Sequence, residues 1–221
     1  MGYSIAIDGP AGAGKSTIAK KVAEKKRFIY IDTGAMYRAM ALYLLQNGIR
    51  PEEHERISAK CKEADITIKH VNGEQVVLLN GENVNALIRT EEVGNMASAS
   101  SINKDVREKL VELQRRLAAS TDVVMDGRDI GTCVLPQADV KIYLTADSSV
   151  RAKRRFDELT AKGEVCDLAK IEKDIVERDE RDMNREISPL RQAQDAVLVD
   201  SSHMTLEEVT RTILDLCDRK R

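Results

Sequence analysis

Apolar residues along the chain fall into two patterns, short continuous runs and longer segments with helical spacing. The continuous runs are expected of strands buried on both faces of a sheet, and several of them end in an acidic or small polar residue. Strands that alternate with helices predict an α/β fold, a parallel sheet with helices on both faces. The five predicted strands are residues 4–8, 28–32, 122–126, 140–146 and 196–200.

The helical patterns lie between these runs, and the longest contains a break near Asn103. Asn103-Lys104-Asp105 is similar to the motif with which GTPases bind guanine, but in that motif one residue separates the lysine from the aspartate. We therefore interpret the segment as the start of a helix. Ligands of such sheets bind beyond the carboxyl ends of the strands. The predicted helices are residues 14–27, 34–47, 91–119, 148–163, 167–186 and 205–219.

One segment interrupts the alternation of strand and helix. Two apolar runs, residues 65–71 and 74–79, are each followed by an Asn-Gly pair, and a third short run begins at Glu82. Asn-Gly after such a run is the strongest short-range signal of a β-hairpin. We therefore expect a small antiparallel sheet of three strands, inserted at about residues 60–90.

Composition narrows the class of protein. The 221 residues are 42% apolar and 33% charged, with a net charge of −2, which argues against a general nucleic-acid binder. No apolar stretch is long enough to span a membrane, and no signal peptide precedes the first strand. Four scattered cysteines have neither zinc nor redox spacing. We expect a cytoplasmic monomer with no membrane and no nucleic-acid polymer as a partner.

The loop after the first predicted strand has the P-loop pattern of glycine, four residues and Gly-Lys-Ser. Glycines let backbone N–H groups surround phosphate oxygens, Lys15 reaches the β and γ oxygens, and the Ser16 hydroxyl can bind Mg²⁺. A glycine turn with a solvated lysine is the alternative. We predict that ATP binds this phosphate loop, which consists of Gly9, Pro10, Ala11, Gly12, Ala13, Gly14, Lys15, Ser16 and Thr17.

Two further strand ends carry polar groups to the same edge of the sheet. Thr33 and Arg38 follow the second strand, although Asp32 and Thr33 are also good helix caps and Arg38 could be a surface residue. The third strand ends in Asp126, Gly127, Arg128 and Asp129. An acidic residue in the place of Asp126 is common near the magnesium of P-loop enzymes, and the planar fork of Arg128 suits phosphate.

A charged helix follows near residue 178. Arg178, Asp182 and Arg185 share one helix face, and Arg181 lies beside it. One interpretation is purely structural, a solvated helix that ion pairs stabilise. The alternative is a set of individually aimed arginines that hold a phosphate and stabilise its transfer.

Together these segments resemble the bacterial type of cytidylate kinase, in the nucleoside monophosphate kinase family, over essentially the full length. The resemblance implies that Lys15, Arg128, Arg181 and Arg185 are catalytic, that Ser16 and Asp126 hold Mg²⁺, and that Arg151 or Arg154 approaches adenine. Thr33 replaces a serine of some members. The implied residues for the acceptor are Thr33, Ser98, Arg107 and Asp129 at its base, Arg38, Arg128 and Arg185 at its phosphate, and Arg178 and Asp182 at its sugar.

The resemblance also implies the reaction and the organisation of the chain. The γ-phosphoryl group of ATP would pass to CMP or dCMP, and a UMP or AMP kinase or a nucleotide-binding switch are the alternatives. The implied P-loop kinase domain spans residues 1–221. Its parts are a core of residues 1–59, 91–150 and 190–221, a β insertion of residues 60–90 that binds the monophosphate, and a helical lid of residues 151–189.

Overall fold

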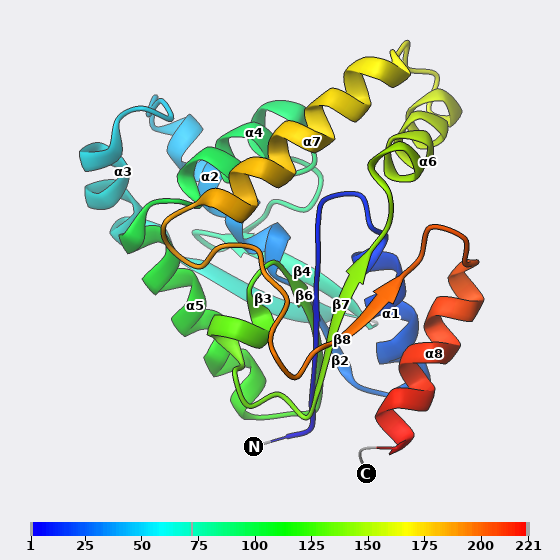
Figure 1. Ribbon diagram of the computed structural model, residues 1–221. Helices are drawn as coiled ribbons and strands as arrows, with labels where there is room; N and C mark the ends of the chain where they lie inside the picture. The colour runs from blue at the N-terminus through cyan, green and yellow to red at the C-terminus, as the bar shows by residue number, and fades with distance from the viewer. Residues whose placement is uncertain (1, 72, 220–221) are drawn as a thin grey trace. The chain divides into compact units, whose positions relative to one another are not determined.

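The parallel sheet contains five strands in the order β2-β6-β1-β7-β8 (Figure 1). A computed structural model describes residues 2–71 and 73–219 of the chain. The strands are β1 (Ser4–Asp8), β2 (Ile29–Asp32), β6 (Val123–Gly127), β7 (Val140–Thr145) and β8 (Val197–Asp200). The predicted sheet is confirmed, and each strand begins and ends within about one residue of its predicted position.

Strand β1 lies inside the sheet because its apolar run suits burial on both faces. It pairs in parallel with β6, where Ser4 is opposite Val123, and with β7, where Ile5 is opposite Val140. Both Ile5 and Ile7 are completely buried. Continuous burial of this kind is typical of a parallel strand, which helices cover.

The chain divides into two compact units. The first contains Ile29–Thr121, and the second contains Tyr3–Phe28 and residues 122–219. The predicted division into core, insertion and lid has other boundaries than these two units, and it stays a prediction.

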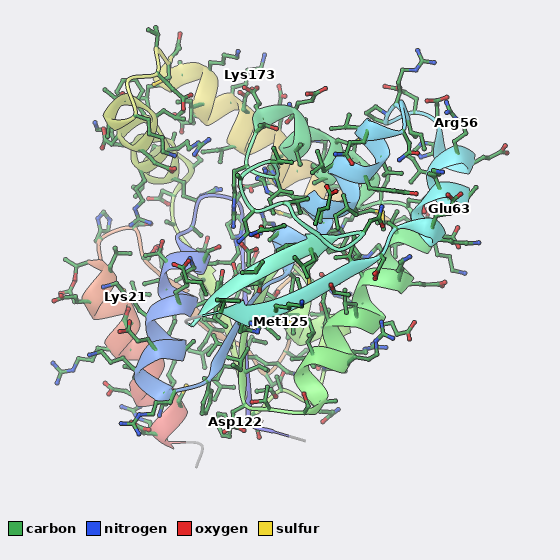
Figure 2. The ribbon with its side chains drawn as sticks, turned by 180° about the vertical axis from the view of Figure 1, so that it is seen from behind. Lys21, Arg56, Glu63, Asp122, Met125 and Lys173 are labelled. Carbon is green, nitrogen blue, oxygen red and sulfur yellow. The ribbon has the colours of Figure 1, made fainter. Side chains whose placement is uncertain are left out.

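The first unit contains a three-stranded antiparallel sheet, as predicted, and the view from behind shows β3 and β4 side by side (Figure 2). Asn80 and Gly81 connect β4 to β5 with φ angles of 51° and 86°. Positive φ at both positions is the requirement of the type I′ turn that Asn-Gly favours. Asn72, in the other predicted turn, lies outside the described residues. The strands are β3 (Ile66–Val71), β4 (Glu74–Leu79) and β5 (Glu82–Asn83).

Helices of the first unit pack on this small sheet and on one another. Helix α2 contacts β3, β4, α4 and α5. Asn103 accepts hydrogen bonds from the backbone N–H groups of Asp105 and Val106, so it caps α5 and confirms the predicted break. The helices are α2 (Thr33–Gln46), α3 (His54–Lys60), η1 (Cys61–Glu63), α4 (Glu91–Ser100) and α5 (Lys104–Ala119).

Helices of the second unit include a pair that follows the sheet strand β7. Helices α6 and α7 pack against each other, whereas α1 packs on β6 and α8 (Figure 1). In the part of the chain that the structure describes, no helix has both the length and the apolar character needed to cross a membrane. The helices are α1 (Lys15–Lys26), η2 (Ile130–Val134), α6 (Ser148–Ala161), α7 (Leu168–Asn184) and α8 (Leu206–Arg219).

Three short helices are absent from the sequence prediction, namely α3, η1 and the π-helical turn η2. They contain seven, three and five residues, too few for an apolar period to be visible. The longer helices are confirmed, with ends within about two residues of the predicted ones. The omission of η2 matters most, because it directly follows Asp129.

Candidate active site

The phosphate loop follows β1 and leads into α1. Gly9, Gly12 and Gly14 have φ angles of 149°, 75° and 83°, which residues with side chains rarely adopt. A Cβ at Gly9 would also lie 1.9 Å from the carbonyl oxygen of Leu144. Helix α1 begins at Lys15, so its partial positive charge is at the loop. Backbone shape and polarity are those of an anion-binding loop.

Lys15 is buried inside this loop. Its Nζ donates a hydrogen bond of 2.6 Å to the carbonyl oxygen of Pro10. Burial lowers the pKa of Lys15 well below its usual value, and the positive charge of Arg128 lowers it further, against the opposing effect of Asp126. A bound polyanion would favour the charged amine, so this side chain is suited to bind phosphate.

Ser16 and Asp126, the predicted magnesium ligands, are in contact. The Ser16 hydroxyl donates to Asp126 Oδ2 at 2.9 Å, and Asp126 is buried at the end of β6. Hydroxyl and carboxylate oxygens suit Mg²⁺, which commonly takes one or two protein ligands and completes its shell with phosphates and water. The chemistry of this pair therefore fits the ion, and its role as a metal site stays a prediction.

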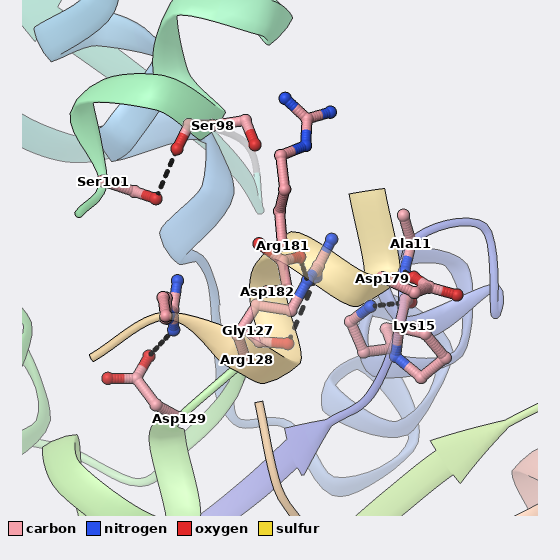
Figure 3. Close-up of polar contacts among 12 residues, drawn as sticks. Ala11, Lys15, Ser98, Ser101, Gly127, Arg128, Asp129, Asp179, Arg181 and Asp182 are labelled. Atoms are coloured by element: carbon pink, nitrogen blue, oxygen red, sulfur yellow. Dashed lines mark hydrogen bonds and ion pairs between the residues drawn. The ribbon is translucent and has the colours of Figure 1, made fainter. Parts of the chain in front are cut away.

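The half-buried Arg128 and the buried Asp182 form an ion pair (Figure 3). Arg128 Nε donates to Asp182 Oδ2 at 2.9 Å. Burial opposes both charges, but the attraction between them outweighs it, so the pKa of Arg128 is raised and the pKa of Asp182 is lowered. Helix α7 thus directs Asp182 at the guanidinium, and the interpretation of a merely solvated helix face does not hold for this residue.

Arg185 and Asp129 form a second pair, whose side chains are both buried. The distance from Arg185 Nη2 to Asp129 Oδ1 is 3.8 Å, and the side chains are 4% and 6% exposed. Arg185 Nε also donates to the carbonyl oxygen of Ser188 at 2.6 Å. Arg178 is close enough for its charge to lower the pKa of Asp182. The second unit therefore brings together Lys15, Asp126, Arg128, Asp129, Arg178, Asp182 and Arg185.

Arg181 is placed differently from the other predicted catalytic residues. It is exposed, and its Nε donates to the carbonyl oxygen of Glu177 in its own helix. Figure 3 shows its guanidinium pointing away from the Arg128–Asp182 pair. The structure does not bring it to the cluster, and its catalytic role stays a prediction.

Arg151 and Arg154, expected near adenine, both contact backbone carbonyls. Arg151 Nη1 donates to the phosphate loop at Ala11 O, 2.8 Å away, and Arg154 Nη2 donates to Ser201 O at 2.7 Å. Asp179, to which the sequence gave no role, pairs with Arg151 at 2.6 Å. A contact with adenine stays a prediction for either arginine.

Thr33 and Arg38, in the first unit, belong to α2. Thr33 is buried at the first position of the helix, and the Asp32 side chain caps it by accepting from Ala35 N–H at 2.9 Å. Arg38 Nη1 donates to Ile88 O at 3.2 Å. The cap interpretation is thus correct for Asp32. Gly94 makes room for Arg38, since a Cβ there would lie 3.0 Å from its Nη1.

Ser98 and Arg107 lie on α4 and α5 of the same unit. Arg107 is buried, its Nη1 donates to Ser101 O at 3.3 Å, and its guanidinium lies 5.6 Å from the centre of the Tyr37 ring. Ser101 Oγ donates to the Ser98 carbonyl oxygen at 2.8 Å. Ser101 therefore connects two of the four residues that the resemblance implies for base binding.

Comparison with known proteins identifies the family. The family model described as cytidylate kinase matches residues 5–219. The chain belongs to the cytidylate kinase family. The cytidylate kinase of Caldicellulosiruptor saccharolyticus is 53% identical over 96% of this chain and 94% of that protein. The cytidylate kinase of Bacillus subtilis is 46% identical over 98% of this chain and 97% of that protein. The chain is therefore a kinase.

Solved structures agree with this family on the fold. Shikimate kinase from Bacteroides thetaiotaomicron superposes with a TM-score of 0.51 at 14% identity, and the match covers 98% of each chain. An uncharacterised protein from Eubacterium ventriosum gives a TM-score of 0.55 at 13% identity, again over 98% of each chain. Likeness at such low identity concerns the arrangement of the backbone alone.

Asp8 is a buried residue next to the phosphate loop that the sequence analysis did not single out. Its two carboxylate oxygens accept hydrogen bonds of 2.7 Å each from the backbone N–H groups of Ile130 and Gly131. It thus fixes η2, which begins directly after Asp129, to the end of β1. An acid at the end of a strand was visible in sequence, but its partners lie more than a hundred residues away.

Replacing Asp8 with Asn should change how stability depends on pH. Burial, more than the nearby Asp129, raises the pKa of Asp8 from 3.8 to about 6 in the folded protein. The folded state therefore binds this proton more tightly than the unfolded chain. The contribution of Asp8 to the free energy of unfolding is therefore complete below about pH 4, and it falls by about 3 kcal/mol as the pH rises through about 6. Urea denaturation at a series of pH values measures this change in the free energy of unfolding.

The Asp8→Asn variant lacks this titration, so it should gain stability relative to the unaltered protein across the same pH range. Asp215→Asn, at an exposed acid of α8, is the control and should follow the unaltered protein. Parallel pH curves for the unaltered protein and Asp8→Asn would contradict the raised pKa.

Proposed function

We propose that the chain transfers the γ-phosphoryl group of ATP to CMP or dCMP, giving ADP and CDP or dCDP. Membership of the cytidylate kinase family supports this pair of substrates. The observation that carries the chemistry is the cluster of Lys15 and the half-buried Arg128 with the buried Asp126 and Asp182 beside a phosphate loop. Such positive groups are suited to neutralise the charge that develops during phosphoryl transfer.

The phosphate loop is the proposed donor site. Its backbone N–H groups and the N-terminus of α1 would hold the phosphates of ATP, and Lys15 would bind their β and γ oxygens. Ser16 and Asp126, whose side-chain oxygens lie 2.9 Å apart, would hold Mg²⁺. The ion would neutralise charge on the phosphate oxygens.

The acceptor is proposed to bind arginines and carboxylates. Arg128 and Arg185 would bind the acceptor phosphate because each guanidinium lies beside a buried carboxylate that holds it in place. The remaining assignments are Arg38 at the phosphate, Arg178 and Asp182 at the sugar, and Thr33, Ser98, Arg107 and Asp129 at the base.

The proposed mechanism needs no general base. The second pKa of a phosphate monoester is about 6, so the acceptor is already a nucleophile at neutral pH. Positioning in line and charge neutralisation by Lys15, Arg128, Arg181 and Arg185 would then supply the rate. We further propose that residues 155–178, with much of α6 and α7, act as a lid that excludes water from the transferred group.

A panel of acceptors tests the proposed function. Turnover of ATP with CMP, dCMP, UMP and AMP should show kcat/KM highest for CMP and dCMP, by about tenfold or more, since contacts to the base discriminate. A preference for AMP or UMP would indicate another monophosphate kinase. Equal turnover with no acceptor would indicate a nucleotide-binding switch instead. The same panel compares ribose with deoxyribose.

A cytoplasmic monomer is part of the same proposal. Support for the compartment comes from the four cysteines, which are thiols and not disulfides, as is usual in a reducing compartment. Sedimentation of the purified protein at several concentrations tests the oligomeric state.

A further inference from the structure

A carboxylate from α7 occupies part of the phosphate loop. Asp179 Oδ1 accepts a hydrogen bond of 3.3 Å from the backbone N–H of Ala11, the third residue of the loop (Figure 3). Asp179 Oδ2 lies 2.6 Å from Arg151 Nη1, and the same Nη1 donates to Ala11 O at 2.8 Å. Asp179 and Arg151 therefore contact both backbone polar groups of one loop residue, the N–H and the carbonyl oxygen of Ala11.

Burial makes this contact unusual for its helix. Most of α7 is exposed or half-buried, and its two buried residues are Asp179 and Asp182. The side chains of Arg151 and Asp179 are only 7% and 8% exposed. Charges in such a place need partners, because burial without them carries a large desolvation cost. Arg151 also donates to Ala146 O at 2.8 Å, so it keeps two carbonyl partners if Asp179 leaves.

The same groups that hold Asp179 would also hold a phosphate. Carboxylate and phosphate oxygens both accept from backbone N–H groups and from guanidinium, and charge strengthens both bonds. The N–H of Ala11 belongs to a loop built to bind phosphate, and Asp179 places a negative charge there. A nucleotide that binds the loop therefore meets a carboxylate that competes for its donors and repels its charge.

We propose that Asp179 is a positioning residue that holds the donor site in a nucleotide-free state. The phosphates of ATP displace its carboxylate from Ala11 and take over Arg151. The proposal rests on ATP as the donor of the proposed reaction. Because Asp182 is three residues further along α7 and pairs with Arg128, a shift of Asp179 also moves a group of the proposed acceptor site. Donor binding is thereby linked to acceptor binding.

Binding of ATP without an acceptor tests this inference. Calorimetry should show that Asp179→Asn binds a non-hydrolysable ATP analogue with Mg²⁺ about 3- to 30-fold more tightly than the unaltered protein. The control is Glu180→Gln, which removes the same charge one residue further along at an exposed position and should leave the affinity unchanged. Unchanged or weaker binding by a folded Asp179→Asn variant would overturn the proposal.

Two more measurements keep the test decisive. In Asp179→Asn, the KM for ATP should fall together with the dissociation constant, and replacing Arg151 with Ala in that background should remove much of the gain. If Asp179→Asn does not fold, a crystal structure of the unaltered protein with the analogue decides, because an intact Arg151–Asp179 pair would refute displacement.

The outcome is distinguishable from failure of the proposed function. Absence of turnover with CMP in the unaltered protein would reject the acceptor, whereas the affinity for the ATP analogue is measured without any acceptor. Tighter binding by Asp179→Asn in a protein that does not phosphorylate CMP would support the inference alone.

Discussion

Replacing Lys15 with Met should lower kcat by about 1000-fold, because the amine would no longer neutralise the transferred phosphoryl group. The same change should raise the stability of the nucleotide-free protein. Burial lowers the pKa of Lys15, so the folded state disfavours the charged amine that the unfolded chain carries at neutral pH. Methionine has a similar length and no such cost. Steady-state kinetics and thermal unfolding measure the two effects.

The Lys15→Met prediction is specific because kcat should fall while the stability of the nucleotide-free protein should rise. Adding ATP with Mg²⁺ should raise the melting temperature of the unaltered protein more than that of the variant, because ligand stabilisation follows affinity. Lys25→Met, an exposed position in the last turn of α1, is the control and should retain activity. A variant that keeps its rate would exclude Lys15 from phosphoryl transfer.

Replacing Arg185 with Ala should lower turnover by about 100- to 1000-fold, as expected when one donor to a developing charge is removed. We expect the variant to fold, because Arg185 lies just after the end of α7 and its Nε bonds a carbonyl only three residues away. Circular dichroism and thermal unfolding check the fold, and kinetics with ATP and CMP check the rate.

Two related changes sharpen this Arg185 prediction. Arg185→Lys keeps the charge but not the planar fork, so its turnover should lie between that of the unaltered protein and that of Arg185→Ala. Arg191→Ala removes an exposed arginine nearby and should leave turnover unchanged. An unchanged rate in Arg185→Ala would remove Arg185 from the proposed acceptor site. Arg181→Ala, measured beside them, tests whether an exposed arginine of α7 takes any part.

Sequence patterns predicted the elements well because each depends on nearby residues. The five strands have continuous apolar runs, and Asn80 and Gly81 adopt the positive φ angles of the predicted hairpin turn. The short helices were not predicted, because an apolar period needs more residues than they contain. In the site, the glycines and Lys15 were recognisable from local spacing alone, as the loop geometry now explains.

The partners of the charged residues were not predictable in this way. Arg128 pairs with Asp182, 54 residues away, and Ala11 with Asp179, 168 residues away. On the sequence, Asp179 and Glu180 are two adjacent acids in one charged helix, yet one is buried at the phosphate loop and the other is exposed. Helical spacing gives the face of a residue but not which segment of the chain covers that face.

The sequence by itself determined the phosphate loop, the order of strands and helices, and the resemblance to cytidylate kinases that the comparisons confirm. These properties follow from local backbone preferences and from short motifs whose chemistry needs particular residues. Only the tertiary structure decided that Asp8 holds η2, that Asp182 holds Arg128 and that Asp179 contacts the loop. Such contacts depend on burial and on long-range packing, which no local pattern encodes.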